Sequence, residues 1–425
     1  MSRPDAIVIG TGLAGLTAAV RLAEGGARVL VLAKGVGATH LGAGTIDVLG
    51  YAPERVSNPL EAIAGLGRDH PYAKVGAEGI GAAAPWLGER VAGGSLAPYA
   101  YTGTVEKNLL LPTAIGVPRP SALVPVTMAG GDLAAGAPIV VVGLRPLKDF
   151  HAALCADMLT RAGYEARATE IDLLPEARVD ANSLGFARAF DDAGWRGQVV
   201  GQLSTRALPA DARIAFPAVL GIRDPHGTWD ALQTALGRPV FEVPTLPPSV
   251  PGMRLAAVLR EALRRAGGSV RLNNVVVGAE ADGSRVRALR VRVGLREERM
   301  EAGAFVLASG GFASGGLELD SRWQAREVAF GLPVAGVPEG DRFTADYFAA
   351  QPMARAGVAV DDELRPVSPG GDVIYDNVRV AGATLAGAEP WKEKSGDGIS
   401  LATGYRAAEL LLAAVPPATV AGEAA

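Results

Sequence analysis

The chain has 425 residues, a length that suits two or three domains rather than one. Its formal net charge is −4, from 41 basic and 45 acidic residues that are spread along the sequence without a basic run. This distribution predicts neither nucleic-acid binding nor attraction to an anionic membrane surface. No apolar run is long enough to span a bilayer, and the first residues lack the profile of a signal peptide. We therefore expect a cytoplasmic protein.

Cys155 is the only cysteine, which excludes an intramolecular disulfide. It also excludes an iron–sulfur cluster held by this chain alone, because such a cluster normally needs four thiolates. The four histidines are scattered, so no metal site is expected. If the protein transfers electrons, an organic cofactor must carry them here, and any cluster must belong to a partner.

The chain begins with a predicted strand at residues 6–9, followed by a glycine-rich turn and a helix that ends near Gly25. The turn has the spacing G-x-G-x-x-G. Gly10 permits the tight turn, Gly12 lets the backbone approach a pyrophosphate, and Gly15 lets the helix pack on the strand. A phosphate-bearing cofactor is therefore predicted at the helix N-terminus, where free N–H groups favour anions. The residues expected to hold it there are Gly10, Gly12, Leu13, Ala14 and Gly15.

One expected feature of a dinucleotide site is missing after the second strand, which is predicted at 28–32. An Asp or Glu should end this strand and hold a ribose hydroxyl, but Ala33 and Lys34 stand there. Two interpretations of Lys34 remain open, a contact with a phosphate and a solvated surface lysine. The turn alone therefore does not establish FAD.

The remaining pattern alternates between strands and helices, as in an α/β protein. Further strands are predicted at 139–143, 166–173, 213–219, 239–243, 269–272, 285–293, 305–308 and 378–381. Helices are predicted at 78–91, 148–162, 229–236, 253–266 and 400–414, with Pro85 expected to kink or divide the first of them. We predict a flavin-binding domain over 1–134, an inserted small α/β domain over 135–245, a return to the first domain over 246–415 with a substrate or cap segment at about 312–365, and a disordered tail at 416–425.

Several later turns are placed where a flavin would be contacted. Backbone N–H groups of the loop 38–45 can bond a flavin ring, and the last helix can direct its positive end at that ring. The residues expected to contact the cofactor in these segments are Thr39, Gly42, Gly44, Thr45, Ser309, Gly310, Gly311, Gly382, Gly396, Gly398 and Ile399. His40 has two interpretations, a covalent flavin anchor or acid/base group and a loop histidine that packs near the cofactor.

The sequence resembles the B-subunit family of the anaerobic glycerol-3-phosphate dehydrogenase, which is related to the fumarate reductase-type flavoproteins. The resemblance extends over nearly the whole chain and depends most on the proline-rich segment 244–250 and on the run 307–317. It implies a Rossmann-like, two-dinucleotide-binding flavoprotein fold with an inserted small α/β domain. The sequence departs from the family before the last helix, where residues 391–398 replace a glycine-rich run.

The resemblance also implies an activity and partners. The activity is a quinone-linked oxidation of sn-glycerol 3-phosphate to dihydroxyacetone phosphate. The implied partners are a second flavoprotein subunit and an iron–sulfur, membrane-associated subunit, which would hold the chain at the inner face of the cell membrane. The family implies FMN for this subunit, and FAD is the alternative that the glycine-rich turn supports.

Oxidation of a phosphorylated polyol needs a base for the hydroxyl proton and a cation for the phosphate. The candidates are His40 as the base, with Arg254 and Arg365 as phosphate ligands, because the planar fork of arginine bonds two oxygens. Two other hypotheses remain open. The chain is a flavin electron-transfer or scaffolding subunit without a substrate, or it is a fumarate reductase-like enzyme that acts on another substrate.

Overall fold

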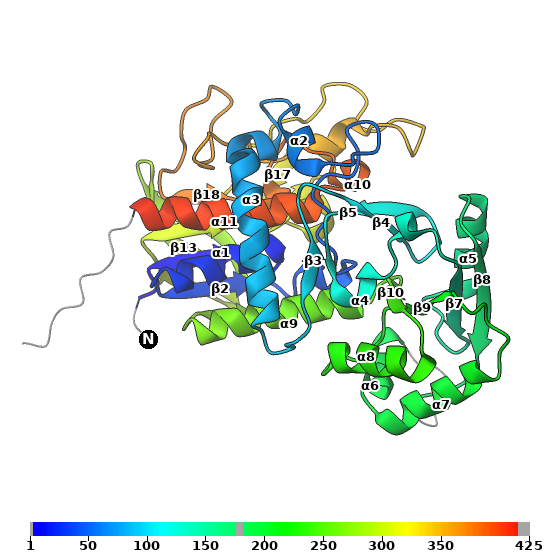
Figure 1. Ribbon diagram of the computed structural model, residues 1–425. Helices are drawn as coiled ribbons and strands as arrows, with labels where there is room; N and C mark the ends of the chain where they lie inside the picture. Colours follow the sequence, from blue (N-terminus) through cyan, green and yellow to red (C-terminus); the bar gives the residue numbers. More distant parts are fainter. Residues whose placement is uncertain (1–2, 176–181, 415–425) are drawn as a thin grey trace, which may run out of the picture.

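The computed structural model describes residues 3–175 and 182–414, and its centre is a five-stranded parallel sheet in the order β11-β2-β1-β15-β18 (Figure 1). The strands are β1 (Ala6–Ile9), β2 (Val29–Ala33), β11 (Ser269–Leu272), β15 (Ala304–Leu307) and β18 (Val378–Val380). In the register of the sheet, Ala6 lies opposite both Val29 and Ala304. β1 is therefore the central strand: β2, which follows it in the chain, lies on one side, and β15, from much later in the chain, lies on the other.

Helices cover one face of this sheet, and a second, antiparallel sheet covers the other (Figure 1). The helices are α1 (Leu13–Glu24), α3 (Pro71–Ala92), α9 (Val250–Arg265) and α11 (Gly396–Ala414), and the antiparallel strands are β12 (Asn274–Asp282), β13 (Arg285–Val293) and β14 (Arg296–Glu301). Successive residues of a strand point to opposite faces of the sheet and pack in two different hydrophobic cores. Val8 packs with the helices, and Ile7 packs with the antiparallel sheet. Burial on both faces explains why β1, β2 and β15 are continuous apolar runs.

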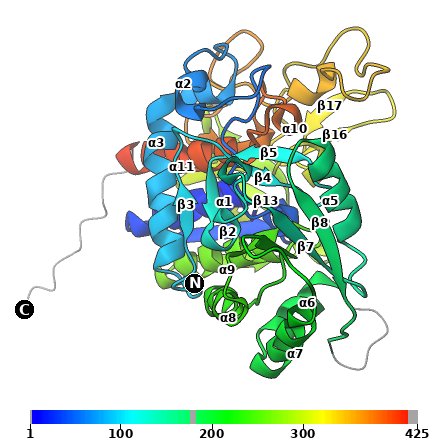
Figure 2. The same cartoon turned by 45° about the vertical axis from the view of Figure 1, so that its right-hand side comes forward.

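A separate four-stranded parallel sheet, in the order β10-β9-β7-β8, has a hydrophobic core of its own (Figure 2). Its strands are β7 (Ile139–Leu144), β8 (Ala166–Ile171), β9 (Arg213–Pro217) and β10 (Val240–Val243), and its helices are α5 (Ala152–Arg161), α6 (Ser183–Phe190), α7 (Ala193–Ser204) and α8 (Pro225–Leu236). All these elements fall inside the segment predicted as an insert. The predicted fold class is confirmed, while the domain boundaries stay a prediction.

The remaining α-helices and strands are short and lie in the connections between the longer elements. They are α2 (Pro59–Ile63), β3 (Tyr101–Gly103), β4 (Leu109–Pro112), β5 (Pro118–Ser121), β6 (Leu123–Pro125), α4 (Val126–Ala129), β16 (Leu317–Leu319), β17 (Ala325–Glu327) and α10 (Pro390–Glu393). Among the residues that the structure describes, no helix is both long and apolar enough to cross a membrane.

Two expectations about helices differ from the structure. Helix α3 continues through Pro85, and its interruption lies at Gly76, where φ is +65°. Helix α11 starts at Gly396, four residues earlier than predicted, so Gly396 and Gly398 lie in its first turn rather than in a preceding loop. The predicted tail at 416–425 lies outside the described residues.

Candidate functional site

A cavity of about 430 Å³ lies beyond the carboxyl ends of β1 and β15. Five parts of the chain line it: the turn after β1, the loop after β2, Leu255 of α9, the turn after β15, and the segment from β18 into α11. Ligands of open α/β sheets bind at this edge. The predicted cofactor residues that line the cavity are Gly10, Gly12, Leu13, Ala14, Thr39, Gly42, Gly44, Thr45, Ser309, Gly310 and Gly382.

The three glycines of the first turn have different surroundings. A Cβ on Gly10, whose φ is +112°, would lie 2.1 Å from the carbonyl oxygen of Ala308, and a Cβ on Gly15 would lie 2.1 Å from the carbonyl oxygen of Gly10. These two glycines let β15 and α1 approach the turn closely. A Cβ on Gly12 would meet no atom within 4 Å, because Gly12 faces the cavity.

The start of α1 suits an anionic group. Gly12 is its N-cap and offers no side-chain cap, so the first N–H groups of the helix are left for a ligand. No acidic residue lies in the first turn. The helix dipole and these N–H groups together favour a phosphate in the adjoining cavity.

Two buried hydroxyl groups also fit a polar ligand. Thr39 and Ser309 line the cavity, and their Oγ1 and Oγ atoms have no hydrogen-bond partner within the described part of the chain. Buried hydroxyls normally have a partner, so this arrangement fits a cofactor whose own polar atoms provide one. The residues present are therefore compatible with a flavin nucleotide.

The loop after β2 lies directly on the glycine-rich turn. The Thr11 hydroxyl donates a hydrogen bond of 3.0 Å to the carbonyl oxygen of Gly35. A Cβ on Gly37 would lie 2.3 Å from the carbonyl oxygen of Thr11. Lys34 is exposed and does not line the cavity, whereas the backbone of Gly35 and Gly37 does. The sequence interpretation did not identify these two glycines.

Asp397, in the first turn of α11, is the one charged side chain among the described residues that line the cavity. Burial, with the nearby Asp47 carboxylate as the second cause, raises its pKa to about 7. Asp47 itself accepts hydrogen bonds from the hydroxyls of Thr45 (2.9 Å) and Ser121 (2.7 Å) and pairs with Arg119 at 3.4 Å. Asp397 can therefore hold or release a proton near neutral pH. Sequence reasoning missed it, although it was the only charge in the run 395–400.

Six predicted cofactor residues do not line the cavity. They are Gly15, Lys34, Gly311, Gly396, Gly398 and Ile399. Gly311 packs against the backbone of Ala383, where its Cβ would meet the carbonyl oxygen at 2.9 Å. Gly398 packs against Tyr72, whose hydroxyl would lie 2.1 Å from an added Cβ. These two glycines serve packing around the cavity.

His40 does not line the cavity, although both of its neighbours in the chain do. Its Nε2 atom is buried without a hydrogen-bond partner in the described part of the chain. Burial, and secondarily the Arg260 guanidinium of α9, lowers the pKa of His40. The ring is therefore placed as a packing histidine between the loop and α9, not as a base that reaches the cavity.

Arg254 is a correction to the sequence interpretation. It is completely buried on α9, where its Nη1 and Nη2 atoms lie 2.7 and 3.0 Å from the two carboxylate oxygens of Glu242. Its Nε and Nη2 atoms also donate to the carbonyl oxygen of Gly221, at 3.0 and 2.6 Å. Each of its three side-chain nitrogen atoms donates to the inserted unit, so Arg254 joins α9 to β10 and is not free to bind a phosphate.

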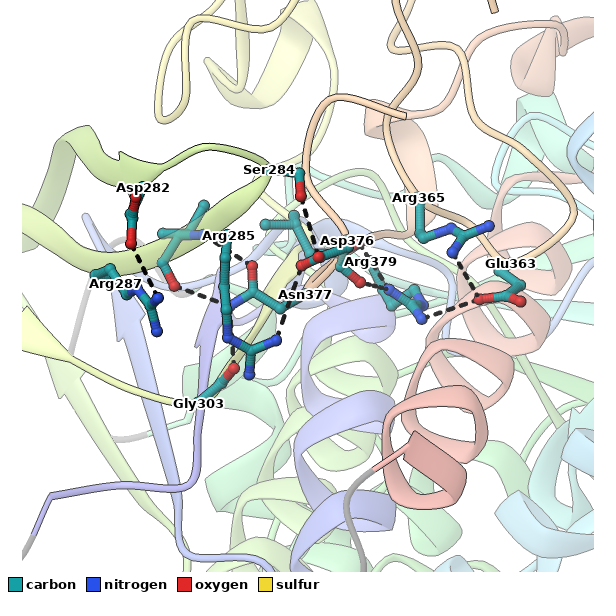
Figure 3. A network of polar contacts seen from close by, with 12 residues as sticks. Asp282, Ser284, Arg285, Arg287, Gly303, Glu363, Arg365, Asp376, Asn377 and Arg379 are labelled. Atoms are coloured by element: carbon teal, nitrogen blue, oxygen red, sulfur yellow. Dashed lines mark hydrogen bonds and ion pairs between the residues drawn. The ribbon is translucent and has the colours of Figure 1, made fainter. Parts of the chain in front are cut away.

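Arg365 is also engaged elsewhere. Its guanidinium pairs with Asp361 at 2.7 Å. It also pairs at 3.4 Å with Glu363, which in turn pairs with Arg379 at 3.3 Å (Figure 3). Arg365 does not line the cavity. The structure therefore brings neither predicted phosphate ligand to the candidate site.

Comparison with known proteins agrees with this geometry. A model of the FAD binding domain family matches residues 5–399. The probable B subunit of the anaerobic glycerol-3-phosphate dehydrogenase of Halobacterium salinarum is 35% identical over 421 residues, covering 95% of this chain and 96% of that protein. The corresponding B subunit of Yersinia enterocolitica is 32% identical over 425 residues, covering 97% and 98%. The solved 3-ketosteroid delta1-dehydrogenase of Sterolibacterium denitrificans has 12% identity and a TM-score of 0.46, covering 98% of this chain and 100% of that one.

Fold, cavity and family model together define a flavin-dependent oxidoreductase of the fumarate reductase type. Within that class, the curated relatives cover almost the full length of the chain at more than 30% identity. The chain belongs to the B-subunit family of the anaerobic glycerol-3-phosphate dehydrogenase.

Proposed function

We propose that the chain is the flavin-carrying B subunit of a respiratory glycerol-3-phosphate dehydrogenase. In this proposal it oxidises sn-glycerol 3-phosphate to dihydroxyacetone phosphate and passes the electrons toward membrane quinone. The observation that carries the proposal is the 32–35% identity to B subunits of this dehydrogenase over nearly the whole chain. The chain would work with a second flavoprotein subunit and an iron–sulfur subunit that holds the complex at the inner face of the cell membrane.

The cofactor we propose is FAD, with FMN as the alternative. The matched family is described as FAD-binding, and the cavity includes the helix N-terminus that suits a pyrophosphate. Gly12, Leu13 and Ala14 would hold phosphate oxygens, and the hydroxyls of Thr39 and Ser309 would bond polar atoms of the cofactor. When bound, the flavin supplies a ring that accepts a hydride. Acid release of the cofactor from purified protein, followed by chromatography, distinguishes FAD from FMN.

Asp397 is the group we propose to accept the hydroxyl proton of the substrate. It lines the cavity, and a pKa of about 7 suits a general base at neutral pH. Besides burial, Asp47 and Arg119, which pair with each other, act on the pKa of this carboxyl by their charges: Asp47 raises it and Arg119 lowers it.

One observation favours a second candidate function, electron transfer or scaffolding without a bound substrate. No Lys, Arg or His is among the described residues that line the cavity. A phosphate ester would therefore need a cation from outside this set.

Addition of sn-glycerol 3-phosphate to the purified chain under anaerobic conditions separates the two functions. Bleaching of the flavin band supports oxidation by this chain. A band that persists, but bleaches once the other subunits are added, supports the electron-transfer role. A flavin that glycerol 3-phosphate never reduces in the complete complex contradicts both.

A further inference from the structure

All the exposed aromatic side chains of the described residues lie on one part of the molecule. They belong to the segment from β16 to residue 351 and to α10, which occupy neighbouring positions in Figure 2. Together they form the aromatic patch: Trp323, Phe343, Tyr347, Phe348 and Trp391. Aromatic residues make up only 5% of the sequence, so this concentration at the surface calls for a function.

The aromatic side chains contact one another. The rings of Tyr347 and Phe348 have centroids 5.2 Å apart, and those of Tyr347 and Trp391 are 6.2 Å apart. Trp323 and Phe343 form a second pair at 6.3 Å. Tyr347 and Phe348 are nevertheless 75% and 78% exposed, so these contacts leave most of their surface open to water.

The loop that carries the patch is held in shape by Gln351. Its side-chain amide donates to the hydroxyl of Thr344 (3.0 Å) and to the carbonyl oxygen of Asp346 (2.8 Å), and its side-chain oxygen accepts from the Thr344 N–H (2.9 Å). Its backbone N–H donates to Glu389, just before α10, at 3.0 Å. A loop fixed in this way loses little conformational entropy when a partner binds.

The exposed charges around the patch are mixed, with an acidic excess. Beside Trp323 and Trp391, the exposed basic residues are Arg322, Arg326 and Lys392, of which Arg326 pairs with Glu318 at 2.8 Å. The segment 337–351 carries three exposed carboxylates, Glu339, Asp341 and Asp346. Its single basic residue, Arg342, is half-buried with its guanidinium 5.9 Å from the centre of the Trp323 ring. Negative charge at this position opposes binding to anionic lipid headgroups and favours a protein surface with basic side chains.

Both ends of the patch are connected along the chain to residues that line the cavity. Trp391 lies on α10, directly before the turn of α11 that contributes Asp397 to the cavity. At the other end, Ser314 lines the cavity and leads into β16, where the segment that bears Trp323 begins. A protein bound on the patch would therefore contact chain segments that lead into the walls of the cavity.

We infer that the aromatic patch is the docking surface for a partner subunit, whose complementary surface has apolar pockets bordered by Lys or Arg. The inference rests on the proposed function, which requires a complex. Large aromatic side chains in such a position carry much of the binding energy of protein interfaces, and truncating one hot-spot residue typically weakens binding about thirtyfold or more.

The test uses the full chain co-expressed with the second flavoprotein subunit and the iron–sulfur subunit, and it compares wild type with the double variant Tyr347→Ser/Phe348→Ser. The control is Leu295→Ser, because Leu295 is the fully exposed tip of the β13–β14 hairpin, away from the patch. We expect the double variant to bind its partners at least thirtyfold more weakly, and the control to bind like wild type. Flavin content and thermal midpoint, equal in all three proteins, show that the variants fold. Asp346→Lys, which reverses one charge of the loop, should also weaken binding.

The possible failures are distinguishable. A wild-type chain that associates with neither of the other subunits contradicts the proposed complex. If wild type associates and the double variant binds equally well, the docking surface lies elsewhere. Two further results overturn the choice of a protein partner: binding of the lone chain to anionic vesicles that the double variant loses, or self-association that the double variant loses.

Discussion

Replacing Arg254 by Met separates a structural role from a phosphate-binding role. The substitution keeps an apolar stem on α9 but removes the guanidinium, which leaves the Glu242 carboxylate buried. Glu242 would keep only the hydrogen bonds from the Thr127 hydroxyl (2.6 Å) and the Leu220 N–H (2.8 Å). Breaking one side of a buried ion pair costs about 3–5 kcal/mol. We expect the free energy of unfolding to fall by this amount, with no change in flavin content per folded molecule.

Urea denaturation followed by near-ultraviolet circular dichroism measures this change. Arg365→Met is the matched control, because Arg365 is partly exposed, and removing an exposed ion pair costs roughly 0–1 kcal/mol. The double variant Arg254→Met/Glu242→Leu should recover part of the loss, because it also removes the unpaired charge. An Arg254→Met protein with wild-type stability and a raised KM for glycerol 3-phosphate would refute the structural role and restore the phosphate-ligand hypothesis.

Three further predictions concern the cavity. Gly10→Ala should weaken flavin binding at least tenfold in a fluorescence titration, because its Cβ would lie 2.1 Å from the carbonyl oxygen of Ala308. The control is Gly26→Ala, where φ is also positive (+88°) but an added Cβ would meet no atom within 4 Å. This control should bind flavin like wild type. Asp397 has a pKa raised from 3.8 to about 7, so its protonated form stabilises the fold at low pH and this contribution is lost as the pH rises from about 4 to 7. Asp397→Asn should flatten the fall in melting temperature over that window, and an unchanged slope contradicts the assignment. Because His40 does not line the cavity, acid should release the flavin from the wild-type protein as readily as from His40→Ala; flavin retained by wild type alone would show a covalent link.

The strands were predictable where burial on both faces leaves a continuous apolar run. The run at 6–9 coincides with β1, all four residues of which are buried. The ranges 285–293 and 269–272 also coincide with strands, but β13 largely alternates buried with exposed residues and β11 is partly exposed. The start of α11 was not predictable, because two glycines suggest a turn. The helix forms there because the Gly398 N–H donates to the carbonyl oxygen of Asp47 at 3.0 Å and only a glycine fits beside the hydroxyl of Tyr72. Such tertiary contacts override local propensity.

The cavity was predictable only where a local motif shapes it. The glycine-rich turn identified Gly10 and Gly12 by spacing alone, but Gly37 acquires its role from a close approach to Thr11, in a separate segment. The roles of the arginines were even harder to predict from the sequence. Nothing in the sequence pairs Arg254 with Glu242, since a proline-rich loop separates them and only the fold brings the two side chains together.

The distribution of charge shows why this chain should need a partner for its proposed reaction. Arg254 and Arg365, the two predicted phosphate ligands, are both engaged in ion pairs. Among the described residues that line the cavity, the one charged group is the carboxyl of Asp397. A cofactor site with a proton acceptor but no cation can take part in oxidation of an alcohol, yet it holds a phosphate ester poorly. In the proposed complex, the cation for the substrate phosphate would come from a partner subunit. A partner docked on the aromatic patch through basic side chains is the candidate source, so substrate binding should depend on assembly of the subunits.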